Sequence, residues 1–333
     1  MTDNRNEAID TFLNAWGWGA ATRKPLAGDA SFRRYERVSN DDGAQAVLMD
    51  APPPKEDVRP FVIIARHLAG LGLSAPRILA VDEVEGFILL EDLGDLTYTR
   101  LLAENDIERA LYELATDTLI HLHRVPNFDV IPDGVVNYGE ERLLEEVGRL
   151  NEWFLPMVNA PALAADVQKS YVDLWKKILP AAWNTPSSLI LFDYHVDNLL
   201  LLPDKVGIQA CGLLDFQDAV CGPVTYDLMS LLEDARRDID PALVSSMKAR
   251  YLAAFPSITP EDFATSWAVM AAQRHIRVIG TFARLNVRDG KPHYLEHMPR
   301  LWRYLDACLT HPVLSPLKDW LTTHVPDGLR VVP

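Results

Sequence analysis

The sequence of 333 residues predicts an α+β protein with a small β-rich N-terminal lobe and a larger, mostly helical C-terminal lobe. Over the first ninety-odd residues, short apolar runs alternate with polar turns, which is typical of a small antiparallel sheet. From about Thr97 onward, long segments instead carry apolar residues at helical spacing. The helical part is interrupted once, at Leu189–Val220, where two strongly apolar runs indicate a β-hairpin. We therefore expect two domains, at residues 1–95 and 96–333.

The N-terminal lobe is expected to hold four strands and one inserted helix. Two strands are expected at 31–38 and 44–50, on either side of the polar turn SNDDG. The proline-rich stretch 51–60 ends the second strand, and apolar spacing at 58–73 then predicts a helix that stops at a glycine. Two further strands, joined by a Glu-Gly turn, follow within 77–94.

The C-terminal lobe is expected to consist mainly of amphipathic helices, of which the clearest are at 107–125 and 166–183. A short connection precedes them. With one β-rich lobe and one helical lobe, we expect the hairpin within 189–220 at the cleft between lobes, where small-molecule sites are common.

The composition limits the possible partners. A formal net charge of −15 without a Lys/Arg cluster argues against nucleic acid, because phosphate backbones are bound by clustered cations. The N-terminal stretch lacks the layout of a signal peptide, and no apolar run approaches the length of a membrane span. Three cysteines without CxxC spacing fit a reducing compartment. We expect a cytoplasmic protein with no nucleic-acid or membrane partner; the sequence leaves the oligomeric state open.

Polar residues interrupt the apolar runs of 189–220. Asp193 and Asn198 lie five residues apart in a loop before the run LLLL, and Asp215 follows at the end of the next expected strand. A carboxylate among apolar strands needs a proton, a metal or a cation as partner. One carboxylate here can accept a hydroxyl proton, while the amide oxygen and the second carboxylate coordinate magnesium. Phosphoryl transfer needs these parts, because its transition state depends mostly on positioning and charge neutralisation.

The stretch DYHVDN, followed by LLDFQDAVCGPVTYDLMSLL, resembles the aminoglycoside phosphotransferase and choline kinase superfamily. The resemblance covers nearly the whole chain and implies a two-lobed, protein-kinase-like fold. In detail the chain is most similar to the bacterial anomeric kinases of cell-wall recycling, which phosphorylate N-acetylmuramate and N-acetylglucosamine. The residues that carry this closer similarity are 28–38, 49–53, 215–219, 226–239 and 273–295.

The resemblance implies a role for each polar residue. Asp193 would be the catalytic base, and Asn198 and Asp215 would bind magnesium. Asp227, at the start of a helix, would orient the catalytic loop. The stretch GDASFRRY would cover the phosphates, and the connection LLEDLG would receive the adenine. The expected cofactors are thus ATP and Mg²⁺, and the expected nucleotide-binding residues are Asp29, Ser31, Arg33, Arg34, Glu91 and Leu93.

One departure from the family pattern concerns the cation that contacts ATP. The strand that normally ends in an ATP-binding lysine carries Met49 and Asp50 at that place. Arg33 and Arg34 are the arginines nearest the expected phosphate turn, and the fork of arginine suits phosphate oxygens. Because successive strand residues point to opposite faces, we expect only one of the two to contact phosphate.

Three residues are candidates for contacts with the acceptor, and each has a structural alternative. Gln217 and Asp218 either line the sugar site or cap the turn after the magnesium ligand. Arg284, like Arg274 and Arg288, stands out in an acidic chain. One of these arginines pairs with the carboxylate of N-acetylmuramate, or all three belong to the solvated face of an amphipathic helix.

The function that combines these features is an ATP- and magnesium-dependent kinase acting on the anomeric hydroxyl of an amino sugar in peptidoglycan recycling. That hydroxyl is more acidic than an ordinary alcohol, so a carboxylate base suffices. Two alternatives stay open. The acceptor is an aminoglycoside, a choline-like amine or another small alcohol; or the chain is a catalytically inactive binding protein with a kinase fold, as the missing lysine suggests. The presence of Asp193, Asn198 and Asp215 together argues against the second alternative.

Overall fold

The computed structural model describes residues 2–26, 32–104 and 107–331. By its internal contacts the chain divides into two compact units. The first is Met1–Thr118 with Val196–Ala219, and the second is Leu119–His195 with Val220–Pro333. The chain crosses between them within helix α4 (Glu108–Arg124), after His195 and after Ala219.

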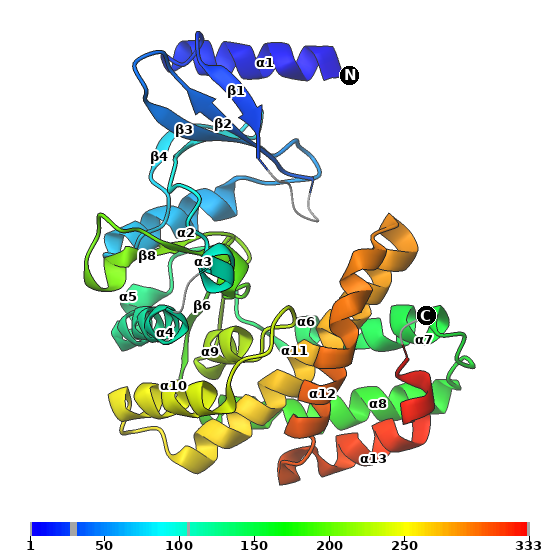
Figure 1. The fold of residues 1–333 in the computed structure, drawn as a ribbon. Helices are drawn as coiled ribbons and strands as arrows, with labels where there is room; N and C mark the ends of the chain where they lie inside the picture. The colour runs from blue at the N-terminus through cyan, green and yellow to red at the C-terminus, as the bar shows by residue number, and fades with distance from the viewer. Residues whose placement is uncertain (1, 27–31, 105–106, 332–333) are drawn as a thin grey trace. The chain divides into compact units, whose positions relative to one another are not determined.

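The first unit contains a five-stranded antiparallel sheet in the order β1-β2-β3-β5-β4, shown in Figure 1. Its elements are α1 (Thr2–Ala15), β1 (Thr22–Pro25), β2 (Arg34–Ser39), β3 (Gln45–Asp50), α2 (Arg59–Gly70), β4 (Ile78–Asp82), β5 (Phe87–Glu91), α3 (Tyr98–Glu104), β7 (Leu199–Leu201) and β8 (Cys211–Leu213). The four predicted strands and the inserted helix are confirmed. The edge strand β1 was missed, because its sequence TRKP is polar and mostly exposed and therefore has no apolar alternation.

Alternation along the strands gives this sheet two different faces. On one face Val38, Leu48 and Phe87 pack against Ile9 and Phe12 of α1, which lies along that side of the sheet in Figure 1. The pairings Arg37↔Val47 and Val47↔Leu90 place these three residues together on the opposite face. The second face is therefore available for a ligand site.

The second unit is mostly helical and contains one two-stranded ladder. Its elements are α5 (Asn127–Val130), α6 (Glu140–Arg149), α7 (Leu155–Met157), α8 (Ala165–Ile178), β6 (Ser187–Ile190), β9 (Val220–Pro223), α9 (Thr225–Leu232), α10 (Pro241–Ala254), α11 (Pro260–Asp289), α12 (Met298–Cys308) and α13 (Ser315–His324). A π-helical turn follows α6 at Leu150–Phe154. Short 3₁₀ turns across the chain are Leu179–Asn184, Val196–Asn198, Gly207–Ala210, Pro292–His297, Pro312–Leu314 and Asp327–Leu329.

The predicted hairpin is confirmed as β7–β8, which belongs to the first unit. The apolar run that precedes it is a separate strand, β6, which pairs with β9 in the second unit. The polar residues after β6 lie between the β6–β9 and β7–β8 ladders. The backbone there forms a 3₁₀ segment instead of continuing as a strand.

Helix α11 is the longest element of the second unit, and it packs against α6, α9 and α12 (Figure 1). Thr259 caps its first turn by accepting a hydrogen bond from the backbone N–H of Asp262, and Gly290 ends it in the left-handed conformation at φ 65°. Gly280 permits a close approach to α6, since a Cβ there would lie 2.5 Å from the carbonyl carbon of Arg149. None of the described helices is long and apolar enough to cross a bilayer.

Candidate active site

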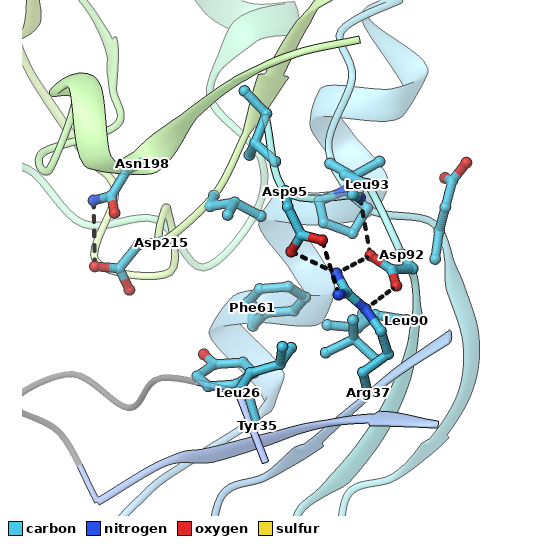
Figure 2. Close-up of a pocket in the computed structure, with 16 residues that line it drawn as sticks. Leu26, Tyr35, Arg37, Phe61, Leu90, Asp92, Leu93, Asp95, Asn198 and Asp215 are labelled. Atoms are coloured by element: carbon cyan, nitrogen blue, oxygen red, sulfur yellow. Dashed lines mark hydrogen bonds and ion pairs between the residues drawn. The ribbon is translucent and has the colours of Figure 1, made fainter. Parts of the chain in front are cut away.

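A cavity of about 260 Å³ lies within the first unit, against the sheet face opposite α1. Tyr35 and Val47 line it from the sheet, Phe61 lines it from α2, and the segment 91–95 lines it after β5. Asn198 and Asp215 line the same cavity, as Figure 2 shows. The fold therefore brings both predicted magnesium ligands to the cavity wall that also contains the segment predicted to receive adenine. In the sequence this segment lies about a hundred residues before the ligands.

The segment after β5 is held by Arg37, which sequence reasoning missed. Arg37 Nε donates to Asp92 Oδ2 at 2.5 Å, and its Nη2 donates to Asp95 Oδ1 at 2.8 Å (Figure 2). The hydrogen bond from Arg37 lowers the pKa of Asp95, so this carboxylate stays charged. Glu91 turns its side chain to Arg77, whose Nε lies 3.0 Å from Glu91 Oε2. The backbone at Glu91 and Leu93 is thus fixed at the cavity wall.

Asp215 has an unusual backbone conformation and is surrounded by polar groups of the first unit. Its φ of 57° lies in the left-handed region, which non-glycine residues adopt rarely and mostly at functional sites. Gln217 Nε2 donates to Asp215 Oδ1 at 2.9 Å. The Asn198 carbonyl accepts from the N–H of Leu214 at 2.9 Å, which ties the two predicted magnesium ligands together. Of the two predicted acceptor contacts here, Gln217 binds Asp215 and Asp218 is exposed.

The oxygen groups of Asn198 and Asp215 suit magnesium, a hard cation that prefers oxygen ligands. Asn198 Nδ2 lies 3.5 Å from Asp215 Oδ2, and turning the amide by 180° puts its oxygen at that position. Among the described residues no cluster of three or more His, Cys, Asp or Glu could hold a metal. Two protein ligands are nevertheless typical of magnesium, which keeps several waters and binds substrate phosphates.

Arg33 and Arg34 have different surroundings, as alternation predicts. Arg33 is largely buried; its Nη1 lies 3.7 Å from Asp215 Oδ1, and its Nε lies 3.5 Å from Glu56 Oε2. Arg34 is 59% exposed and pairs with Asp50 at 2.6 Å. Arg33 is therefore the arginine of the two that lies beside the predicted metal ligand. The predicted nucleotide contacts Asp29 and Ser31 fall outside the described residues.

The loop that carries Asp193 belongs to the second unit and is fixed by Asp227. Asp227 is fully buried at the start of α9 and accepts hydrogen bonds from the backbone N–H groups of Leu191, at 2.6 Å, and Phe192, at 3.0 Å. Phe192 has a φ of 74°, which is strained for a bulky residue. Asp193 follows directly and is half-buried. These contacts are what a residue that orients the catalytic loop would make.

Aromatic and cationic side chains of the second unit surround the ring of Phe192. It stacks on Tyr226 with ring centroids 5.4 Å apart and meets Tyr138 edge-on at 5.5 Å. The guanidinium carbons of Arg142 and Arg277 lie 4.5 and 4.2 Å from its centroid. Sequence reasoning missed both arginines. The two cation–π contacts and the stacked rings oppose the strain in the backbone before Asp193.

The two arginines also share a buried carboxylate, that of Glu146. It accepts hydrogen bonds from Tyr138 Oη at 2.5 Å, Gln273 Nε2 at 2.9 Å and Arg142 Nε at 3.0 Å. Burial raises the pKa of Glu146, but the charge of Arg277 and these hydrogen bonds outweigh it and lower the pKa overall. Glu146 therefore stays ionised and holds both cations in place.

The solvated-face interpretation of the arginines on α11 is wrong for Arg274, which is only 3% exposed. Burial lowers its pKa, as expected for a cation taken out of water. Arg288 fits that interpretation, since it is exposed and pairs with Asp289 at 2.7 Å. Arg284 is half-buried, and burial, then Arg149 and Arg288, lower its pKa.

The titration of Asp227 gives a prediction about stability. Burial raises its pKa to about 7, although the hydrogen bonds from Leu191 and Phe192 act in the opposite direction. In an unfolded chain an aspartate titrates at about 3.9. Between about pH 4 and 7 the folded state thus holds a proton that the unfolded state releases. The free energy of unfolding should fall as the pH rises through this interval, by at most about 1.4 kcal/mol per pH unit.

Urea unfolding at about pH 5 and pH 7.5 tests this in the wild type and in Asp227→Asn, where the group cannot titrate. The wild type should lose more stability between the two pH values than the variant does. Equal losses would show that Asp227 is already ionised at pH 5.

Comparisons with known proteins agree with this geometry. The model of the phosphotransferase enzyme family matches residues 22–261. A protein of Caulobacter vibrioides named N-acetylmuramate/N-acetylglucosamine kinase is 35% identical to this chain, with 99% of each chain covered. A protein of Pseudomonas aeruginosa with the same name is 39% identical, with 94% of this chain and 92% of that protein covered.

Among solved structures, the GDP complex of aminoglycoside 2'-phosphotransferase-IIIa matches with a TM-score of 0.63 at 14% identity. The match covers 91% of this chain and 99% of that one. Likeness at this identity concerns the fold, and it confirms the predicted protein-kinase-like architecture. Because the family model spans most of the sequence and the two relatives align over nearly all of it, the chain belongs to the phosphotransferase enzyme family and is a small-molecule phosphotransferase.

Proposed function

We propose that this chain transfers the γ-phosphoryl group of ATP to the anomeric hydroxyl of N-acetylmuramate and N-acetylglucosamine, in the recycling of peptidoglycan. The names of the two relatives support the choice of acceptors. The observation that carries the proposal is the cavity of the first unit, whose wall includes both the segment 91–95 and the pair Asn198 and Asp215. A nucleotide with its adenine at the first and its phosphates at the second would span that cavity.

In this proposal the nucleotide binds residues 1–95 together with the β7–β8 hairpin, and the rest of the chain binds the acceptor. Adenine meets the backbone at Glu91 and Leu93, which Arg37 holds in place through Asp92 and Asp95. Asn198 and Asp215 would hold magnesium, which neutralises charge on the phosphates. The GDP in the aminoglycoside phosphotransferase structure supports a nucleotide at this fold's site.

Asp193 would accept the proton of the anomeric hydroxyl. As that oxygen bonds to the γ-phosphorus, the bond from phosphorus to the bridging oxygen breaks and ADP leaves, while the proton ends on Asp193. The hydrogen bonds from Leu191 and Phe192 to Asp227 fix the backbone before the base. The products are ADP and a sugar 1-phosphate.

A panel of acceptors tests this function against the alternatives. The purified protein is incubated with Mg²⁺ and either ATP or GTP, and with N-acetylmuramate, N-acetylglucosamine, an aminoglycoside or choline. Phosphorus NMR should show an acid-labile sugar 1-phosphate with the amino sugars. Turnover of the aminoglycoside or choline alone would favour the second acceptor class. Tight nucleotide binding without turnover of any acceptor would favour an inactive binding protein.

Arg33 would supply the cation that Met49 does not provide. Its guanidinium lies beside Asp215 and is braced by Glu56, so phosphates held at Asp215 would come within reach of it. Arg33→Ala should raise the KM for ATP by about tenfold or more, as expected for the loss of a charge-assisted hydrogen bond.

Arg34→Ala is the matched control, because Arg34 is the neighbouring arginine on the opposite face. It pairs with Asp50, which retains Arg5 at 2.7 Å after the substitution, so the KM for ATP should stay close to that of the wild type. Steady-state kinetics with ATP varied distinguishes the two variants. A normal KM in Arg33→Ala would move the phosphate-binding cation to Lys24, Lys55 or the second unit.

A further inference from the structure

Arg142, in the second unit, lies beside the Asp193 loop with a fixed orientation and a partly exposed side chain. Its guanidinium carbon lies 4.5 Å from the ring centroid of Phe192 and 5.4 Å from that of Tyr138. Phe192 directly precedes Asp193. A positive charge is therefore held against the side chain of the residue that directly precedes the proposed base.

The orientation of Arg142 is set from two sides. Its Nε donates to Glu146 Oε1 at 3.0 Å, and the face of its guanidinium lies over the aromatic rings. Glu146 is itself fixed by Tyr138 and Gln273. The Arg142 side chain is 35% exposed, whereas that of Glu146 is 3% exposed. Within the described part of the chain, Arg142 donates a hydrogen bond through Nε alone, which leaves the Nη1 and Nη2 groups of the fork for a ligand.

We propose that Arg142 is a carboxylate-binding subsite for the acceptor, and that it favours sugars that carry an acid group over neutral ones. This inference rests on the proposed function. N-acetylmuramate differs from N-acetylglucosamine by a lactic acid ether on the oxygen of C3, so its carboxylate is attached through the ring carbon two bonds from the anomeric carbon. A guanidinium fork whose orientation is already fixed binds a carboxylate through two hydrogen bonds at low entropic cost.

The charge of Arg142 would offset electrostatic repulsion between an acidic sugar and the protein. The chain has a formal net charge of −15, and Asp193 itself is a carboxylate. An acidic sugar approaching Asp193 would be repelled without a compensating positive charge. A neutral sugar would need no such group, so the effect of Arg142 should differ between the two acceptors.

Two other arginines of the second unit, Arg277 and Arg284, fit this role less well. Arg277 also lies over Phe192, but its side chain is only 9% exposed, against 35% for Arg142. Arg284, the residue expected from the sequence to contact the acceptor, lies seven residues beyond Arg277 on α11. At 1.5 Å per residue this is about 10 Å further along the helix axis.

The decisive measurement is kcat/KM for both sugars in Arg142→Met and Arg142→Lys. In Arg142→Met the value for N-acetylmuramate should fall about tenfold to a hundredfold further than the value for N-acetylglucosamine, whose own smaller decrease reports the lost contact with Phe192. Arg142→Lys keeps the charge without the fork, so its loss with N-acetylmuramate should be intermediate. A fold defect would lower the values for both sugars together.

The methyl ester of N-acetylmuramate removes the charge from the ligand instead. The wild type should discriminate against the ester, and Arg142→Met should treat acid and ester alike, because the interaction is then already lost. Arg109→Met removes another Arg–Glu pair spaced four residues apart on a helix and should alter neither value.

Two results would overturn the inference. Equal losses with both sugars in Arg142→Met would show that Arg142 only supports the loop. A loss selective for N-acetylmuramate in Arg284→Met but not in Arg142→Met would move the subsite to Arg284. If the wild type phosphorylated neither sugar, the proposed function itself would fail, which is a separate result from the other two.

Discussion

Replacing Asp193 by alanine is expected to lower kcat by about two to four orders of magnitude, the range attributed to a general base. The backbone before Asp193 is held by Asp227 and is strained at Phe192, so the segment that carries this carboxylate is fixed. Nucleotide affinity should change little, because the cavity proposed for the nucleotide is lined by residues of the first unit and Asp193 belongs to the second.

Two measurements separate these effects. Steady-state kinetics gives kcat, and calorimetric titration with ADP and magnesium gives the affinity for nucleotide. Asp197→Ala is the matched control, since Asp197 is an aspartate of the same sequence stretch whose side chain accepts a hydrogen bond from Thr99. Its kcat should remain within about tenfold of the wild type. Near-wild-type turnover in a folded Asp193→Ala protein would remove Asp193 from the mechanism.

The strands of the first unit could be predicted where burial leaves an apolar pattern in the sequence. Strands β2 to β5 bury one face against α1 or line the cavity with the other, so their sequences alternate or run apolar. Strand β1 is an edge strand that pairs only with β2 and is mostly exposed. Because β1 is mostly exposed, its sequence carries no apolar pattern. Only its pairing with β2 in the structure shows that it is a strand.

The candidate site also contains some residues that the sequence predicted and others that only the structure shows. Asp193, Asn198 and Asp215 lie within one stretch of the sequence, so their spacing predicted them, and the family resemblance implied Asp227. Other contacts join segments that are distant in the sequence. These are the hydrogen bonds from Arg37 to Asp92 and Asp95, and the hydrogen bonds around Glu146. Such clusters depend on which elements pack together.

The burial of Arg274 depends on packing in the same way. An arginine every few residues on a helix normally indicates a solvated face, but α11 is packed against several other helices, and this arginine faces the interior. The sequence could therefore single out Arg274, but its burial could be found only in the structure.

Asp215→Asn should raise the magnesium concentration needed for half-maximal activity by about tenfold or more and lower activity at saturating magnesium by about a hundredfold. The substitution removes a charge from a hard-cation site, and an amide cannot replace it. Asparagine also suits the test structurally. It tolerates the left-handed conformation better than most residues, so the backbone at φ 57° should be retained and the effect assigned to charge.

Initial rates measured against magnesium at fixed ATP give both quantities. Gln217→Ala provides the comparison, because it removes the hydrogen bond to Asp215 Oδ1 and leaves the carboxylate charged. Its effect should be smaller, about tenfold or less, since the negative charge that attracts magnesium stays in place. An unchanged magnesium dependence in Asp215→Asn would mean that the metal binds elsewhere. The proximity of Asp215, Asn198 and Arg33 would then require another explanation, such as an ion-pair network that only stabilises the first unit.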